Sequence, residues 1–290
     1  MPYIYLISSV VCCASESLVG AFYNKKNSEM KDSSPLYSFL AMCSVFVFWT
    51  VMFCTDSKMD WNVAWYALLF AGFYTLCNVC MIRALKTGPV LLTSLFLQLS
   101  LIGTTVWGFF FWNAKFTLLV AMGLALVVLA IWLCLRTGQK ESEGTKINVK
   151  WLIYVVFMFI GNAGCSITQR TQQTKFDGEY GNFLMMLATG LSVMICLIIY
   201  LKSDRCDSKR IVKGSWYFPV MAGGLNGFLN LFVILLATSP LSSSLVYPVI
   251  GVGSLMITTL FSTVVFKEKM RWWQWIGIIT GMAAVAILSL

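Results

Sequence analysis

The chain has 290 residues, of which 59% are hydrophobic and only 11% are charged, and its mean hydropathy is +0.79. Soluble domains carry roughly 25% charged residues, so this composition excludes a soluble globular protein and indicates an integral membrane protein. The net charge of +9 does not indicate nucleic-acid binding, because almost every Lys and Arg lies in a connector between apolar segments.

Ten apolar segments follow one another along the chain. Each has about the 20 residues that a helix needs to cross roughly 30 Å of hydrocarbon. They are continuously apolar, whereas the strands of a membrane barrel alternate apolar and polar residues, so the fold class is all-α. The polar stretches 136–150 and 202–215 are connectors, and the first segment is an uncleaved helix. The predicted spans are residues 3–22, 36–54, 62–82, 90–112, 117–135, 151–169, 181–201, 216–237, 241–266 and 272–290.

The second half of the chain repeats the first. The turn at residues 84–89 returns at 235–240, and a shift of 151 positions places Pro89 on Pro240. Segments three to five therefore match segments eight to ten, and an offset near 149 aligns the first segments of the two halves. Because each half has five helices, the halves must enter the membrane from opposite sides. We predict two inverted five-helix repeats, residues 1–135 and 151–290, joined by the connector 136–150.

The charged break after the ninth segment carries the most specific pattern. The sequence Phe266-Lys267-Glu268-Lys269-Met270 precedes a final segment with Gly277 and Gly281. Together with the 84–89 turn and Thr93-Ser94, this pattern resembles the drug/metabolite transporter superfamily, specifically its ten-helix EamA-like members. That resemblance implies a transporter whose fifth and tenth helices lie at the periphery. The opening Pro2–Leu6, followed by an acid in the first segment, also resembles small multidrug resistance proteins.

The distribution of positive charge predicts the topology. Most of the 21 Lys and Arg residues lie in connectors one, three, five, seven and nine. The positive-inside rule places these odd-numbered connectors in the cytoplasm and both termini outside, with the plasma membrane as the expected location.

Glu16 is the strongest single candidate for function. Of the 12 acidic residues, it alone falls deep in a predicted span, where an ionised group costs on the order of 3 kcal/mol even on translocon scales. Burial disfavours the carboxylate form, which would allow protonation and substrate binding to compete at one site. The alternative is a permanently protonated packing residue bonded to Ser9, Ser15 or another helix.

Other segments supply polar side chains for a central cavity. The face of the first segment that carries Glu16 is expected to oppose a polar stripe on the sixth segment. No Lys or Arg is expected at the centre, which disfavours phosphorylated substrates and favours cations, zwitterions or neutral metabolites. The candidate substrate-binding residues are Glu16, Asn78, Gln98, Asn162, Gln169, Asn226, Asn230 and Tyr247.

These features predict a secondary active transporter that exports a small metabolite, amino acid or lipophilic cation, with protons coupled through Glu16. The alternatives are a passive pore and a membrane interaction protein. An enzyme is not expected, because the chain has no His and no pair of intramembrane acids for acid/base work. Metals and cofactors are not expected either: Cys77 and Cys80 have no second pair to complete a site. The expected partners are a small-molecule substrate and the lipid bilayer, with a monomer sufficient and a homodimer as the alternative.

Overall fold

The computed structural model describes residues 2–30, 33–100, 107, 111, 118–136, 148–237, 243–266 and 272–287. Within these residues the regular elements are helices, and no strand is present. The elements are α1 (Pro2–Lys26), α2 (Ser33–Thr55), η1 (Trp61–Val63), α3 (Ala64–Thr87), α4 (Val90–Leu99), α6 (Leu118–Arg136), α7 (Val149–Lys175), α8 (Gly181–Leu201), α9 (Ser208–Ser215), α10 (Tyr217–Ala237), α11 (Ser243–Val264) and α12 (Trp272–Ile287).

Six of these helical stretches have the length and apolar composition to cross a membrane: α1, α2, η1 with α3, α7, α8 and α10. Shorter apolar helices occupy residues 90–99, 121–130, 249–264 and 275–284, inside the other four predicted spans. Several sequence features lie outside the described residues, namely most of 101–117, the centre of the connector 136–150, the second turn at 238–240, and Glu268. The chain is thus a multi-pass, membrane-embedded helical protein.

The turn between α3 and α4 is fixed by its Gly-Pro pair. The Gly88 N–H donates to the Ala84 carbonyl at 3.0 Å. Pro89 has no N–H to continue the helix, and it is the N-cap residue of α4. A Cβ on Gly88 would lie 2.2 Å from the Trp151 ring. The Trp151 Nε1 donates to Thr93 Oγ1 at 3.0 Å, so this turn anchors the start of α7.

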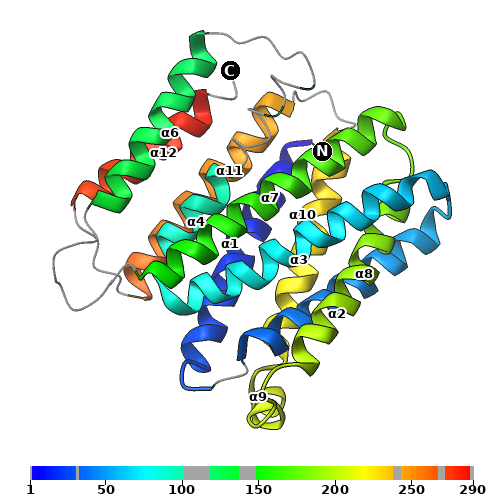
Figure 1. Ribbon diagram of the computed structural model, residues 1–290. Coiled ribbons are helices and arrows are strands. Elements are labelled where there is room, and N and C mark those ends of the chain that lie inside the picture. Colours follow the sequence, from blue (N-terminus) through cyan, green and yellow to red (C-terminus); the bar gives the residue numbers. More distant parts are fainter. Residues whose placement is uncertain are drawn as a thin grey trace.

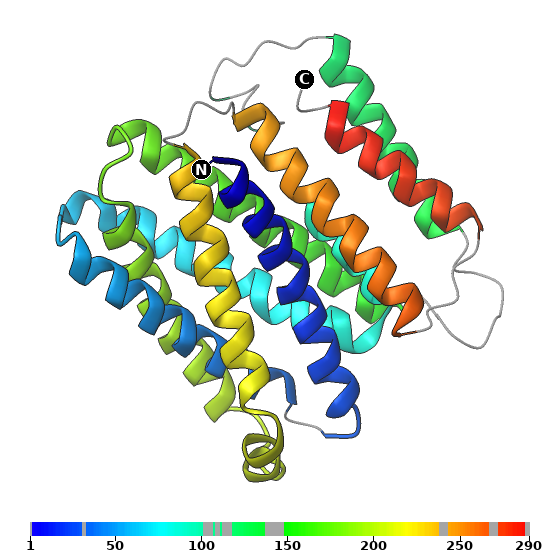
Figure 2. The same cartoon turned by 180° about the vertical axis from the view of Figure 1, so that it is seen from behind.

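The helices pack in pairs drawn from the two halves of the chain. The most extensive contacts join α3 to α7, α1 to α10, α2 to α8 and α6 to α12, and α4 also packs on α11. Figures 1 and 2 show α6 and α12 together at one edge of the bundle, which is where the resemblance placed the fifth and tenth helices. On its other side α12 packs closely on α4, because a Cβ on Gly281 would lie 2.9 Å from Leu95.

Large apolar side chains remain exposed on the outside of the bundle. Val47 is 61% exposed, Phe157 46% and Met194 57%. In a soluble protein such a surface would aggregate, whereas in hydrocarbon it is the surface expected of spanning helices. The outer face of the bundle is therefore lipid-facing.

Connectors one, three and seven meet at one end of the bundle. The Lys86 Nζ donates to the Met30 carbonyl at 2.7 Å, which joins connectors three and one. The Lys26 Nζ donates to the Gly214 carbonyl at 2.7 Å, which joins connector one to α9. The start of α1 and the end of α12 lie toward the opposite end (Figure 1).

The connector 202–215 differs from the sequence prediction, because it contains the short helix α9. One face of this segment packs against the bundle. The buried residues on it recur at helical spacing: Ser208, Ile211 and Ser215. The helix packs on α2, and Lys26 at the end of α1 also bonds to it. Eight residues are too few for a hydropathy window to register as a span.

Candidate transport site

A carboxylate and an amide meet inside the bundle. The Asn226 Nδ2 on α10 lies 3.1 Å from each carboxylate oxygen of Glu16 on α1. Because the partner is a neutral amide, the carboxylate is hydrogen-bonded without being held in an ion pair. The acid can therefore exist in either protonation state without breaking a salt bridge.

The orientation of Asn226 is fixed by two further donors. The Tyr74 hydroxyl on α3 donates to Asn226 Oδ1 at 2.6 Å, and the Asn230 Nδ2 donates to the same oxygen at 3.1 Å. The Asn230 Nδ2 also bonds to the Asn226 backbone carbonyl at 2.9 Å. With Oδ1 occupied as an acceptor, the Nδ2 of Asn226 must point at Glu16.

This network borders a pocket formed by four helices. The volume of this pocket that is open to water is only about 10 Å³, roughly enough for one water molecule. In this conformation the pocket is thus too small for more than about one water molecule. Its lining residues are Glu16, Gly20, Tyr37, Ala41, Val45, Tyr74, Asn78, Met81, Ile82, Leu85, Ala222, Gly223 and Asn226.

Two polar groups in the pocket wall extend its hydrogen-bonding capacity. The Asn78 Oδ1 is buried and has no hydrogen-bond partner among the described residues. The Tyr37 hydroxyl lies next to Gly20, 3.5 Å from where a Cβ on that glycine would be. A buried acceptor without a partner is costly in an empty pocket and would be satisfied by a ligand or water that offers a donor.

The structure places two other candidate residues in contacts between helices. The Gln98 Nε2 on α4 donates to Ser254 Oγ on α11 at 2.9 Å, and the Asn162 Nδ2 on α7 donates to Ser100 Oγ at 2.7 Å. Neither lines the pocket. Gln169 lies half-buried on α7 and is not a lining residue either. Tyr247 belongs to α11, and its side chain is outside the described residues.

The expected opposition of the first and sixth segments is not what forms this pocket. Its lining residues come from α1, α2, α3 and α10, and none comes from α7. The reason is packing: α7 lies along α3, where a Cβ on Gly161 would be 2.7 Å from the Cys77 backbone nitrogen. The polar side chain of Asn162 is turned to α4 instead.

The list of candidate residues drawn from the sequence omitted two aromatic side chains of the pocket. Tyr74 shares α3 with Asn78 one turn away, which is a signal that the sequence contained. Tyr37 lies on α2, a helix without any charged or amide residue, so nothing in the pattern marked it.

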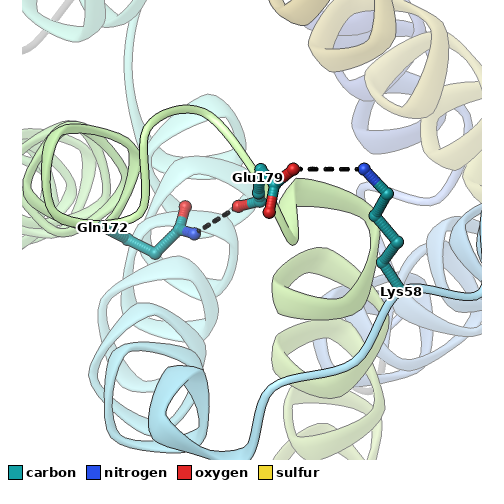
Figure 3. Close-up of polar contacts among 3 residues, drawn as sticks. All are labelled: Lys58, Gln172 and Glu179. Atoms are coloured by element: carbon teal, nitrogen blue, oxygen red, sulfur yellow. Dashed lines mark hydrogen bonds and ion pairs between the residues drawn. The ribbon is translucent and has the colours of Figure 1, made fainter.

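At the opposite end of the bundle from α9, the two halves are joined by an ion pair (Figure 3). The Lys58 Nζ lies 3.2 Å from Glu179 Oε1, and the Gln172 Nε2 donates to the Glu179 backbone carbonyl at 2.9 Å. The hydrogen bond and the charge of Glu179 raise the pKa of Lys58, so the ammonium stays charged at neutral pH. Both side chains are about half exposed.

A helical membrane protein with a narrow pocket and polar groups among its spans has the form of a membrane transporter. The chain belongs to the EamA-like transporter family, whose family model matches residues 1–136 and again residues 149–290. This is a family of transporters and not of enzymes. Within the described residues, no group of three or more His, Cys, Asp or Glu side chains is placed to hold a metal ion.

Two relatives extend this comparison. An uncharacterized protein of Haemophilus influenzae is 23% identical over 168 residues, which are 58% of this chain and 55% of that protein. The chain therefore matches about half the length of this relative. A solved crystal structure matches 99% of this chain and 95% of its own at a TM-score of 0.62, with 11% sequence identity. At that identity the likeness shows the fold alone.

Proposed function

We propose that this protein is a secondary active transporter of ten spans, which moves its substrate by alternating access between two inverted five-helix repeats. The repeats are residues 1–135 and 151–290, with 136–150 as their connector. The double match of the family model supports this division. The direction we propose is export across the plasma membrane by a monomer.

The helix pairings support the repeat. In the proposed repeat, α1 corresponds to α7, α2 to α8, α3 to α10 and α6 to α12. If the two halves are exchanged, the α3–α7 pair becomes the α10–α1 pair, and the α2–α8 and α6–α12 pairs stay the same. All of these pairs are observed. A twofold relation between inverted repeats would produce this self-mapping set.

The observation that carries the proposal is the Glu16–Asn226 contact at the boundary between the halves. Glu16 belongs to the first half and Asn226 to the second, so any rocking of one half against the other alters the surroundings of the carboxylate. A proton and a substrate that compete for Glu16 would then be carried in opposite directions.

The lining chemistry supports the substrate class. It contains one acid, amides and tyrosines, and no Lys or Arg. Anionic phosphates would require basic partners, whereas an amine cation, a zwitterion or a neutral metabolite would find acceptors. The proposed substrate is therefore a small metabolite, amino acid or lipophilic cation.

The test is flux in proteoliposomes under an imposed pH gradient, with an aromatic amine cation, a zwitterionic amino acid and a neutral sugar as probes. We expect saturable flux of one probe class, accompanied by lumenal pH change, in the wild type. Glu16→Gln should abolish the gradient-driven part. Glu29→Gln removes an exposed acid and should leave flux unchanged. Equal gradient-driven flux in Glu16→Gln and wild type would remove Glu16 from coupling, and flux that does not saturate would favour a pore.

A further inference from the structure

Helix α9 runs across the bundle rather than along it. Both views show α9 nearly end-on, while the spanning helices are seen from the side (Figures 1 and 2). Its buried face is held in place: the Ser215 hydroxyl donates to Asn27 Oδ1 at 3.4 Å, and Lys26 bonds to the Gly214 carbonyl. Since the spans cross the membrane, α9 lies roughly parallel to the membrane plane.

The aromatic residues after α9 mark its depth. Trp216 is 53% exposed and Tyr217 39% exposed, and α10 enters the bundle directly from Tyr217. Trp and Tyr at the start of a span are typical of the boundary between headgroups and hydrocarbon. Val212, one turn before Trp216, is also exposed, at 42%. The outward side of α9 thus has an apolar flank at the level where the acyl chains begin.

The rest of the outward side is basic and unpaired. The side chains of Lys209, Arg210 and Lys213 are exposed. None of these side chains makes a hydrogen bond or an ion pair with any residue in the described part of the chain. Lys209, Lys213 and Trp216 follow one another at spacings of four and three, so they share one flank of the helix. That flank therefore has two basic residues followed by one aromatic residue.

We propose that α9 is an interfacial helix that binds the headgroups of anionic phospholipids, at a site separate from the transport pocket. Three cations without protein partners lie at headgroup depth, and the exposed Val212 and Trp216 lie where acyl chains would cover them. A zwitterionic headgroup would neutralise them less well than an anionic phosphate, because it carries its own positive charge. Each Lys or Arg next to a membrane surface raises the affinity for anionic lipid roughly fivefold.

The test compares lipid binding next to Trp216 in the full-length protein. The protein is reconstituted in vesicles of phosphatidylcholine with increasing phosphatidylglycerol, and one of the two lipids carries brominated acyl chains that quench tryptophan. Subtracting the quenching of the matched Trp216→Phe protein isolates Trp216. We expect preferential quenching by phosphatidylglycerol that weakens with salt. In the triple variant Lys209→Gln, Arg210→Gln, Lys213→Gln, the preference for phosphatidylglycerol over phosphatidylcholine should fall at least tenfold.

Two controls keep the result specific. Lys140→Gln, Lys146→Gln, Lys150→Gln removes the same charge from another connector and should leave the preference at Trp216 intact. The swap Lys209→Arg, Arg210→Lys, Lys213→Arg keeps the charge and should also retain it, even if the neutral triple variant folds poorly. Equal quenching by the two lipids in the wild type, or an unchanged preference in the triple Gln variant, would overturn the proposal.

Discussion

Glu16 and Asn226 are 210 residues apart in the chain, yet the carboxylate of one accepts from the amide of the other. In hydrocarbon a lone carboxylate is costly, and a Lys or Arg partner would stabilise its charged form permanently. A neutral amide reduces the cost without fixing the charge. This is the property that a proton carrier needs, and the Tyr74 and Asn230 contacts preserve it by preventing Asn226 from turning over.

The amides in the pocket and between helices should respond differently to truncation. Asn78→Ala removes an Oδ1 that has no partner, so we expect little loss of stability but a raised half-saturating substrate concentration. Asn162→Ala breaks the bond to Ser100 and should cost about 1 kcal/mol with little change in half-saturation. Thermal unfolding in detergent and concentration-dependent flux measure the two effects, and the reverse pattern would contradict this assignment.

At the scale of elements, small residues set the distance between helices. A Cβ on Gly161 of α7 would meet backbone atoms of Cys77 and Phe73 on α3 at 2.7 and 2.8 Å. Backbone atoms cannot move aside as a side chain can. Close approach of this kind, driven by dispersion and not by the hydrophobic effect, holds helices together in lipid.

Gly161→Ala should therefore destabilise the protein by about 1–3 kcal/mol, the usual range for overpacking. Gly72→Ala on the partner helix is the matched control, because a Cβ there has no neighbour within 4 Å. That variant should be neutral or slightly stabilising, since Ala has the higher helix propensity. Thermal unfolding of the two purified variants compares them, and equal behaviour would show that α3 and α7 can separate freely.

The Lys58–Glu179 pair links the α2–α3 and α7–α8 connectors. Its geometry depends on a tight turn in which Asp177, Gly178 and Tyr180 all have positive φ. Exposed ion pairs contribute little to global stability, so its effect should be local. Lys58→Gln should speed hydrogen exchange of the amides around 176–180, and Lys58→Glu with Glu179→Lys should restore protection. Lys202→Gln at the opposite end is the control, and unchanged exchange in Lys58→Gln would show that the pair does not hold this turn.

At the scale of the whole molecule, the connectors sort to two ends. Contacts through Lys86 and Lys26 gather connectors one, three and seven, and the Lys25 Nζ lies 5.5 Å from the Phe266 ring centroid, where connector nine begins. Connectors two and six meet at the other end through Lys58 and Glu179. For the connectors to sort in this way, successive spans must run in opposite directions. The distribution of Lys and Arg over the connectors predicts the same alternation.

We predict that the basic end faces the cytoplasm. A reporter that is active only in the cytosol should give little signal when fused to the C-terminus. The same reporter inserted in the connector 136–150 should give a strong one. Signals in the opposite order would show that the basic end faces away from the cytoplasm. The grouping of the connectors would be unaffected by that result.

Local features of the chain were predictable from the sequence. The apolar segments, the Gly88-Pro89 helix break and the isolation of Glu16 in a span all depend on a few neighbouring residues and on the cost of polar groups in hydrocarbon. The sequence also marked Asn78, Asn226 and Asn230, although on separate helices and together with Gln98 and Asn162, which the structure places in other contacts. Helix α9 escaped prediction because its buried face is only three residues long and two of them are serines.

What the sequence determined by itself is that the chain is a helical membrane protein with one acid deep in an apolar segment. Only the tertiary structure decided which polar groups share a pocket. That choice depends on how α3 packs between its neighbours, how Tyr37 reaches inward from an otherwise apolar helix, and where Asn162 finds a partner. Each is a contact between residues far apart in the chain, and periodicity can indicate which face of a helix is polar but cannot indicate which helix that face meets.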